Sequence, residues 1–301
     1  MAKAYVLYNP IAGDGRSEYT LKKLDEVLTD EYVLCDITTS EDYEKDIASM
    51  GKDDYVVVCG GDGTLNRFIN RIHGTSIEHD IKYFPCGSGN DFAREFGKEK
   101  YCAPFSIKKY LTDLPTVTVK GKSSRFINGI GYGIDGYCCR VGDEQRSVSD
   151  KPVDYTAIAI KGLLFHYKPC NARVTVDGKT YDFKKVWIAP TMIGKYYGGG
   201  IMPTPTQNRD SEDGKLSLMV FHGSSNIKTL IMFPSLFKGE HLKYAKHVST
   251  FEGYDISVEF DSPRELQIDG ETVVDVSEYR AVSARLAPSE DNAKKAETSA
   301  N

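Results

Sequence analysis

The sequence predicts two lobes of different class, an α/β lobe followed by a mainly β lobe. Strand and helix patterns alternate from residue 3 to residue 114, which is typical of a parallel αβα lobe with helices on both faces of its sheet. After Pro115, strand patterns separated by Gly, Pro and Asp-Gly turns dominate, which predicts an antiparallel, β-sandwich-like C-terminal lobe. The 301 residues exceed what one core usually holds, so we expect a cleft between the lobes.

The first lobe is predicted to contain four strand and helix pairs. The expected strands are residues 4–8, 31–37, 55–59 and 81–84. The expected helices begin at Ser17 and Ser40, the second ending near Gly51, and cover residues 65–72 and 91–96. The Val-rich run of the third strand is typical of a parallel strand that is buried on both faces.

The second lobe is predicted to contain strands interrupted by one helix, at about residues 155–165. Its expected strands are residues 117–119, 126–130, 172–176, 185–188, 216–221 and 256–260. We therefore divide the chain into an α/β domain at 1–115, which residues of about 278–287 would complete, and a mainly β domain at 116–277. Residues 288–301 contain no large apolar side chain, which predicts a disordered tail.

Composition excludes several functional classes. The net charge of −5 disfavours nucleic acid as a partner. The seven cysteines form neither a CxxC pair nor a zinc pattern, which favours reduced thiols and a cytoplasmic protein. No apolar run approaches the roughly 20 residues that cross a bilayer, so a protein acting on lipid would associate with the membrane peripherally.

Three glycine-bearing loops follow strands of the first lobe. They read NPIAGDG from Asn9, GGDGTLN from Gly60 and PCGSGND from Pro85. Because parallel strands end at one sheet edge, we expect these loops to converge there. Glycines let backbone N–H groups approach a phosphate, and two of the loops lead into helices, whose N-termini favour anions. None matches the P-loop or the GxGxxG fingerprint. A nucleotide site is the prediction.

Asp62 lies inside the second glycine loop. A carboxylate next to phosphates is repulsive unless a cation lies between them, and Mg²⁺ prefers such oxygen ligands. Asp62 therefore suggests Mg²⁺. It could also cap the helix that starts at Thr64, and the two roles are compatible.

These motifs resemble the diacylglycerol kinase catalytic-domain family, which includes bacterial lipid kinases and sphingosine and ceramide kinases. The resemblance rests on YNPIAGDG, GGDGTLNRFIN and FPCGSGNDFAREFG, continues through FINGIGYGIDGYCC, GGGIMPTP, SEDGKLSLMV and LQIDGE, and covers about residues 3–287. It implies a fold like those of diacylglycerol and NAD kinases. It also implies an enzyme that uses ATP and Mg²⁺ to phosphorylate a lipid hydroxyl, with conversion of diacylglycerol to phosphatidic acid as the first choice.

The resemblance also implies roles for individual residues. The ATP site would be lined by Asn9, Pro10, Ile11, Ala12, Gly13, Thr39, Gly60, Gly61, Asp62, Gly63, Thr64, Leu65, Ser88 and Asn90. Asp62 would act through the Mg²⁺ network at the phosphates. A second-lobe metal site would use Asp213 with the backbone carbonyls of Asp210 and Lys215.

The general base implied by the resemblance is Glu271, with Asp269 as the second choice. From the residues alone, Asp269-Gly270-Glu271 is a hairpin turn, because Asp-Gly is a strong hairpin signal. The chain departs from the family pattern at Ala12, where Ser is common, at Ser88, where bacterial members often have Thr, and at Arg67, where an acidic residue is common.

Residues 227–237 are strongly apolar and precede Lys238, Lys243 and Lys246. They could face acyl chains and anionic head groups at a membrane surface, although a core helix kinked by Pro234 is the favoured interpretation. A homodimer through an exposed edge of the second lobe is an open option. So are three other acceptors (a sphingoid base, phosphatidylglycerol or an isoprenoid alcohol) and two other functions, an NAD kinase and a non-catalytic nucleotide- or lipid-binding regulator.

Overall fold

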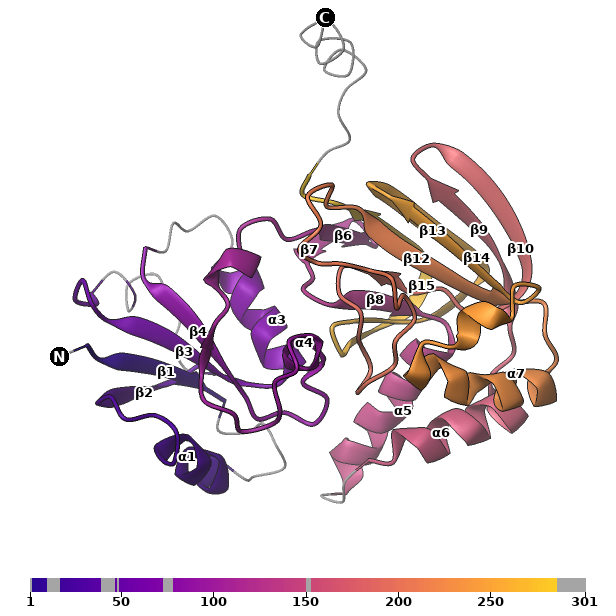
Figure 1. Cartoon of the computed structure of the whole chain (residues 1–301). Helices are drawn as coiled ribbons and strands as arrows, with labels where there is room; N and C mark the ends of the chain where they lie inside the picture. Colours follow the sequence, from indigo (N-terminus) through magenta and orange to yellow (C-terminus); the bar gives the residue numbers. More distant parts are fainter. Residues whose placement is uncertain are drawn as a thin grey trace, which may run out of the picture.

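A computed structural model of the chain describes residues 2–9, 17–38, 47, 49–72, 78–149 and 153–285. Predictions for residues 10–13 and 39, for most of the helix beginning at Ser40 and for the tail at 288–301 lie outside these residues. The described residues form two lobes that lie side by side, with α3 and α4 of the first lobe facing the second (Figure 1).

The first lobe is built on a sheet with the strand order β2-β1-β3-β4-β5. Its strands are β1 (Ala4–Tyr8), β2 (Tyr32–Asp36), β3 (Tyr55–Gly60), β4 (Asp80–Pro85) and β5 (Phe105–Ser106). Its helices are α1 (Ser17–Asp25), α3 (Asp62–Arg71), α4 (Asp91–Glu95) and the 3-10 turn η1 (Lys108–Tyr110). The first four strands are parallel and β5 is antiparallel to β4, which confirms the predicted parallel α/β lobe.

The central strand β3 is buried along its whole length because apolar side chains cover both faces of the sheet. On one face, Val56 and Val58 lie in the core that includes Leu65 and Phe68 of α3. On the other face, Val57 lies in the core that includes Leu24 of α1. The Val-rich run therefore positions the loop that follows it, which carries the GGDGT residues, at the carboxyl edge of the sheet.

The second lobe is built on a sheet with the order β7-β6-β15-β14-β8-β11-β12-β10-β9, in which β13 pairs with β12 and β14 also pairs with β9. Among the described residues, the strand pairings of this sheet are antiparallel, which confirms the predicted sandwich-like lobe. The strands are β6 (Thr116–Val119), β7 (Lys122–Arg125), β8 (Gly129–Tyr132), β9 (Cys170–Val176), β10 (Lys179–Ile188), β11 (Thr191–Met192), β12 (Leu216–His222), β13 (Val248–Gly253), β14 (Asp255–Ile268) and β15 (Glu271–Val282).

Helices of the second lobe lie together along one side of its sheet (Figure 1). They are α5 (Ile134–Val148), α6 (Tyr155–Lys161), the π-helical turn η2 (Gly162–His166), α7 (Asn226–Met232), and the 3-10 turns η3 (Phe233–Lys238) and η4 (His241–Lys243). The predicted helix at 155–165 corresponds to α6 and η2. Among the described residues, no helix is long and apolar enough to cross a membrane.

The sequence did not predict α5, which is the longest helix of the second lobe. Its glycines hide the helical pattern, yet the packing requires at least one of them. A Cβ on Gly136 would lie 2.2 Å from the carbonyl oxygen of Glu265, so only glycine lets α5 approach β14 this closely.

The expectation that residues of about 278–287 complete the first lobe differs from the observed arrangement. Residues 279–282 of β15 pair with β6 in the second sheet. Tyr279 and Ala281 are buried in the core of the second lobe, and this burial holds the end of β15 there.

Candidate active site

The second and third glycine loops meet at the carboxyl edge of the first sheet. A Cβ on Gly87 would lie 2.4 Å from the Cα atom of Gly61, and one on Gly61 would lie 3.0 Å from the Cα atom of Gly87. The two backbones therefore touch where only glycine fits. This contact confirms the predicted convergence for these two loops. Most of the first loop lies outside the described residues, and Asn9 directly follows β1, which is the neighbour of β3.

Asp62 links three elements through its carboxylate. It accepts hydrogen bonds from the backbone N–H groups of Asp91 and Phe92, each at 3.0 Å, and thereby caps the N-terminus of α4. It also accepts a bond of 3.0 Å from the Nδ2 atom of Asn128 in the second lobe. Asp62 thus fixes the two glycine loops to each other and to the second lobe. The sequence-based alternative was a cap on its own helix, whereas the helix it caps is α4.

Asp91, which the sequence-based prediction of site residues omitted, is buried beside Asp62. Its Oδ2 atom accepts a bond of 2.8 Å from the N–H group of Gly199 in the second lobe. Its Oδ1 atom has no hydrogen-bond partner among the described residues. Burial, followed by the negative charge of Asp62, raises the pKa of Asp91 to about 7. Arg94 Nε lies 3.8 Å from this Oδ1 atom, so the carboxylate already has a cationic neighbour. Among the described residues, no group of three or more His, Cys, Asp and Glu side chains could hold a metal ion, so a divalent cation at Asp62 and Asp91 would need the phosphate oxygens as further ligands.

Asp269 is buried at the start of the β14–β15 turn and its acceptor positions are occupied. Its carboxylate accepts bonds from the N–H groups of Ile127 (2.7 Å), Asn128 (2.8 Å) and Gly129 (3.0 Å). It also accepts a bond of 2.8 Å from the Nδ2 atom of Asn66 on α3. Asp269 therefore joins the two lobes. Burial raises its pKa, against the lowering effect of these donors.

Glu271 lies on the other side of the same turn, next to the GGDGT residues. A Cβ on Gly63 would lie only 2.9 Å from its Oε1 atom. The side chain is 46% exposed, and each carboxylate oxygen lies 3.3 Å from the Nη2 atom of Arg67. Glu271 thus presents a solvent-accessible carboxylate at the N-terminus of α3. The family departure at Arg67 supplies its ion-pair partner.

Three other residues predicted for the nucleotide site differ in the exposure and the hydrogen bonds of their side chains. The side chain of Ser88 is exposed, whereas that of Leu65 is buried in the core, so Leu65 can contribute only its backbone. Asn90 has a positive φ of 51°. Its side chain accepts a bond from the N–H group of Gly87 and donates one to the carbonyl of Gly87, both at 2.9 Å. Asn90 therefore shapes the third loop.

A buried ion pair, which the sequence did not predict, fastens the lobes behind this site. Arg209 lies 2.8 Å from the Oε2 atom of Glu95, and these side chains are 5% and 7% exposed. Arg209 also donates to the side chain of Asn128 at 3.2 Å and to the carbonyl of Ile127. Breaking a buried pair leaves an uncompensated charge, so Arg209 and Glu95 hold the lobes in a fixed relation.

The predicted second-lobe metal loop is held by cationic side chains. Asp213 accepts bonds from Ser211 Oγ (2.7 Å) and Lys215 N–H (3.2 Å). The side chain of Asp210 lies 3.1 Å from Lys109 Nζ, and the carbonyl of Lys215 accepts a bond from Gln207. Arg285 Nη1 donates to the carbonyls of Ser211 (2.9 Å) and Glu212 (2.7 Å). Lysine and arginine side chains thus already lie close to the carboxylates and carbonyls of this loop.

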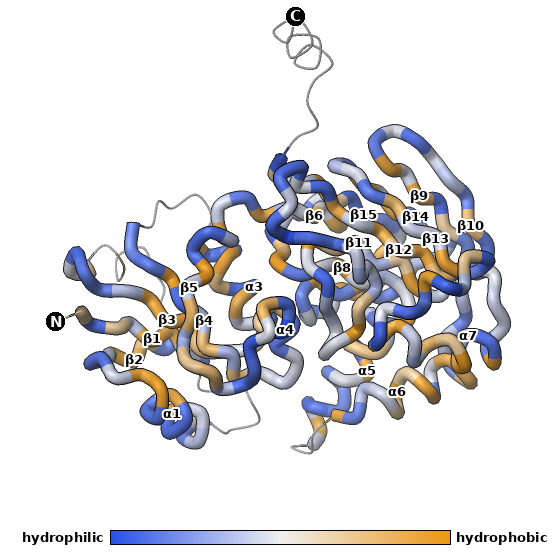
Figure 2. Tube along the Cα trace, viewed as in Figure 1, coloured by the Kyte–Doolittle hydropathy of each residue, from blue (hydrophilic) through white to orange (hydrophobic). Residues whose placement is uncertain are grey.

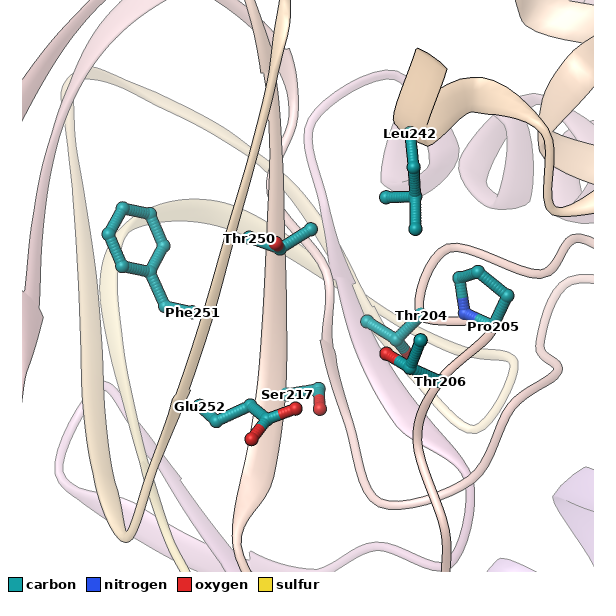
Figure 3. Close-up of a pocket in the computed structure, with 8 residues that line it drawn as sticks. All are labelled: Thr204, Pro205, Thr206, Ser217, Leu242, Thr250, Phe251 and Glu252. Carbon is teal, nitrogen blue, oxygen red and sulfur yellow. The ribbon is translucent and has the colours of Figure 1, made fainter. Parts of the chain in front are cut away.

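A pocket of about 290 Å³ lies elsewhere in the second lobe (Figure 3). Its lining includes Thr204, Pro205, Leu242 and the neighbouring β12 and β13 residues Ser217 and Glu252. None of the predicted site residues lines it, so it is separate from the interlobe site.

Comparison with known proteins identifies the class to which this fold and site belong. Residues 3–116 match the family described as "Diacylglycerol kinase catalytic domain", and residues 128–288 match the "YegS C-terminal NAD kinase beta sandwich-like domain". The chain therefore belongs to the diacylglycerol and lipid kinase family.

Two relatives illustrate the similarity. A diacylglycerol kinase of Mycobacterium tuberculosis (strain ATCC 25618 / H37Rv) is 30% identical over 214 residues, which cover 68% of this chain and 67% of that protein. The crystal structure of a diacylglycerol kinase from Bacillus anthracis str. Sterne has the same fold. It matches with a TM-score of 0.55 and 18% identity, and the match covers 95% of each chain.

Proposed function

We propose that this protein is an ATP- and Mg²⁺-dependent lipid kinase that transfers the γ-phosphoryl group of ATP to a lipid hydroxyl, converting diacylglycerol to phosphatidic acid. One observation carries the proposal: the second and third glycine loops of the first lobe and Glu271 of the second lobe meet at one place. Family membership supports the reaction class, and the named relatives support diacylglycerol as the acceptor.

The first lobe would bind the nucleotide. Phosphoryl transfer depends on positioning and charge neutralisation, and the loop around Gly60, Gly61 and Gly63 offers backbone N–H groups at the start of α3. The contact between Gly61 and Gly87 fixes this loop before ATP arrives, which lowers the cost of ordering it.

Asp62 and Asp91 would hold the Mg²⁺ that accompanies ATP. The ion supplies charge that shields the phosphate oxygens. The carboxylates in turn are positioned by α4, Asn128 and Gly199, so both lobes contribute to their orientation.

Glu271 would accept the proton of the acceptor hydroxyl as the γ-phosphoryl group is transferred. Its carboxylate is accessible to a substrate, whereas the oxygens of Asp269 are already occupied by four donors. A general base must reach the proton that it removes. We therefore assign the base to Glu271 and a positioning role to Asp269.

Incubation of the protein with γ-labelled ATP, Mg²⁺ and a lipid panel tests the proposal. The panel contains dispersed diacylglycerol, a sphingoid base, phosphatidylglycerol and an isoprenoid alcohol, and NAD serves as a non-lipid acceptor. We expect label in diacylglycerol. Label in NAD alone would support an NAD kinase, and label in no acceptor would support a non-catalytic binding protein.

A further inference from the structure

One surface of the second lobe exposes large apolar side chains to water. Phe165 is 76% exposed, Ile231 is 70% exposed and Ile227 is 67% exposed. Ile160 adds a fourth apolar side chain at 40%. We call these four residues the α6–α7 face. Isolated exposed apolar residues are common, but a group on adjoining elements indicates an interaction site.

The elements that carry these residues adjoin each other. The turn η2, which contains Phe165, directly continues α6, and Asn226 at the start of α7 donates a bond of 2.9 Å to the carbonyl of Leu163 in η2. The opposite sides of both helices are buried, as shown by Ile158 and Met232. The prediction of a core helix at 227–237 therefore holds for one side of α7, while the other side is exposed. Figure 2 shows apolar segments on α6 and α7 at the edge of this lobe.

The charge around this face is positive. Residues 155–168 and 225–238 contain four lysines and no Asp or Glu, although the whole chain has a net charge of −5. The lysines, all exposed, are Lys161, Lys168, Lys228 and Lys238. None of them forms an ion pair with a carboxylate in the described part of the chain. Exposed apolar side chains among unpaired lysines match the interface of an anionic bilayer.

We propose that the α6–α7 face docks onto the surface of an anionic phospholipid bilayer. The choice of a bilayer rests on the proposed function, because a lipid acceptor is held in a membrane. The α6–α7 face is also connected through the fold to the interlobe site, where the lipid acceptor would react. Helix α6 packs against α5, which follows β8, and the segment leading into β8 binds Asp269 through Ile127 and Asn128. Docking would thus hold the interlobe site near the membrane.

A second copy of the chain is a poorer occupant of this face. A twofold interface places the same patch of both subunits together, so two sets of unpaired lysines would face each other. That repulsion disfavours a dimer here, whereas an anionic head-group layer neutralises the same charges.

Flotation with vesicles of phosphatidylcholine and phosphatidylglycerol in equal parts tests the proposal. The test variant combines Phe165→Ser, Ile227→Ser and Ile231→Ser. The matched control combines Tyr19→Ser, Leu34→Ser and Val274→Ser, which remove exposed apolar side chains on α1, β2 and β15, elements that do not carry the face. We expect the test variant to bind at least about tenfold more weakly than the wild type, and the control to bind as the wild type does.

Two further measurements sharpen the outcome. Replacing Lys161 or Lys228 by Ser is expected to weaken binding roughly fivefold for each lysine, and added salt is expected to weaken it further. Equal flotation of the test variant and wild type would overturn the proposal, as would equal loss in the control. A wild-type dimer that dissociates only in the test variant would also overturn it, by assigning the face to a second copy.

Turnover of a short-chain, water-soluble diacylglycerol without vesicles separates this inference from the proposed function. The test variant should phosphorylate it at the wild-type rate, because the face lies outside the interlobe site. If neither protein phosphorylates any acceptor while flotation still differs, the kinase proposal fails and the docking face stands.

Discussion

Replacing Asp269 by Asn should damage stability, whereas replacing Glu271 by Gln should damage catalysis. The side-chain amide introduced by Asp269→Asn would keep one acceptor oxygen, so two of the four bonds to Asp269 would be lost and an amide donor would face N–H groups. Each bond to a charged group contributes about 1.5–3 kcal/mol. Removal of a buried charge offsets part of this loss, which leaves a destabilisation of about 3 kcal/mol.

The fluorescence of Trp187, the sole tryptophan and a buried residue of the second lobe, reports unfolding in urea. Asp269→Asn is expected to lower the free energy of unfolding by about 3 kcal/mol, a large part of the roughly 5–15 kcal/mol typical of proteins. Glu271→Gln, at an exposed position, should change it by less than about 0.5 kcal/mol and lower kcat by about 10²–10⁴. An Asp269→Asn variant with wild-type stability and no turnover would refute this reasoning and make Asp269 the base.

Three other changes test separate parts of the structure. Gly87→Ala should displace the loop at Gly61, because the new Cβ atom would lie 2.4 Å from the Cα atom of Gly61. In steady-state assays this variant should reduce kcat/KM for ATP by at least about tenfold. Unchanged kinetics would exclude a role for the contact between Gly61 and Gly87. Asp135 is a buried carboxylate at the start of α5. Burial raises the pKa of Asp135 from 3.8 to about 6, so its stabilising contribution is complete below pH 3.8 and is lost as the pH rises through about 6. Asp135→Asn should therefore gain about 3 kcal/mol over the wild type between about pH 4 and pH 7 in urea titrations, and a pH-independent difference would contradict this. Arg285→Ala should lower the melting temperature by removing the donors to the carbonyls of Ser211 and Glu212, while EDTA should leave wild-type melting unchanged. A wild-type loss in EDTA that is absent in Asp213→Ala would mean that a metal holds the loop.

The sequence was sufficient to predict the class of both lobes and the meeting of the second and third glycine loops; residues 10–16 of the first loop lie outside the described residues. The Val-rich run of β3 and the glycines that follow it are local signals, and parallel strands must end at one edge. These features depend on residues close together in the chain. They therefore remain visible without tertiary information.

Features that depend on distant contacts could not be predicted in the same way. The donors to Asp269 come from residues 127–129 and from Asn66, which lies 203 residues away. The burial of Asp91 depends likewise on Gly199, 108 residues along the chain. Asp91 lies within a motif that the sequence shows, but nothing in its local sequence shows that the second lobe buries it. The contact of Arg285 with the carbonyls of Ser211 and Glu212 could not be predicted for the same reason.

The exposure of Ile227 and Ile231 illustrates a different limit. An apolar helical segment predicts burial, and Thr229 and Met232 are indeed buried. Because α7 lies at the edge of the lobe with no described element over its outer side, hydropathy alone could not distinguish a fully buried helix from one with an exposed apolar side.

One experiment tests the shared interlobe site most directly. It measures the transfer of label from γ-labelled ATP to diacylglycerol by the wild type and by the Glu271→Gln variant. ATP binding is measured on the same samples. We predict that the wild type labels the lipid, and that the variant binds ATP normally but labels the lipid at about 1% of that rate or less. Labelling by the variant at the wild-type rate would contradict the proposed site.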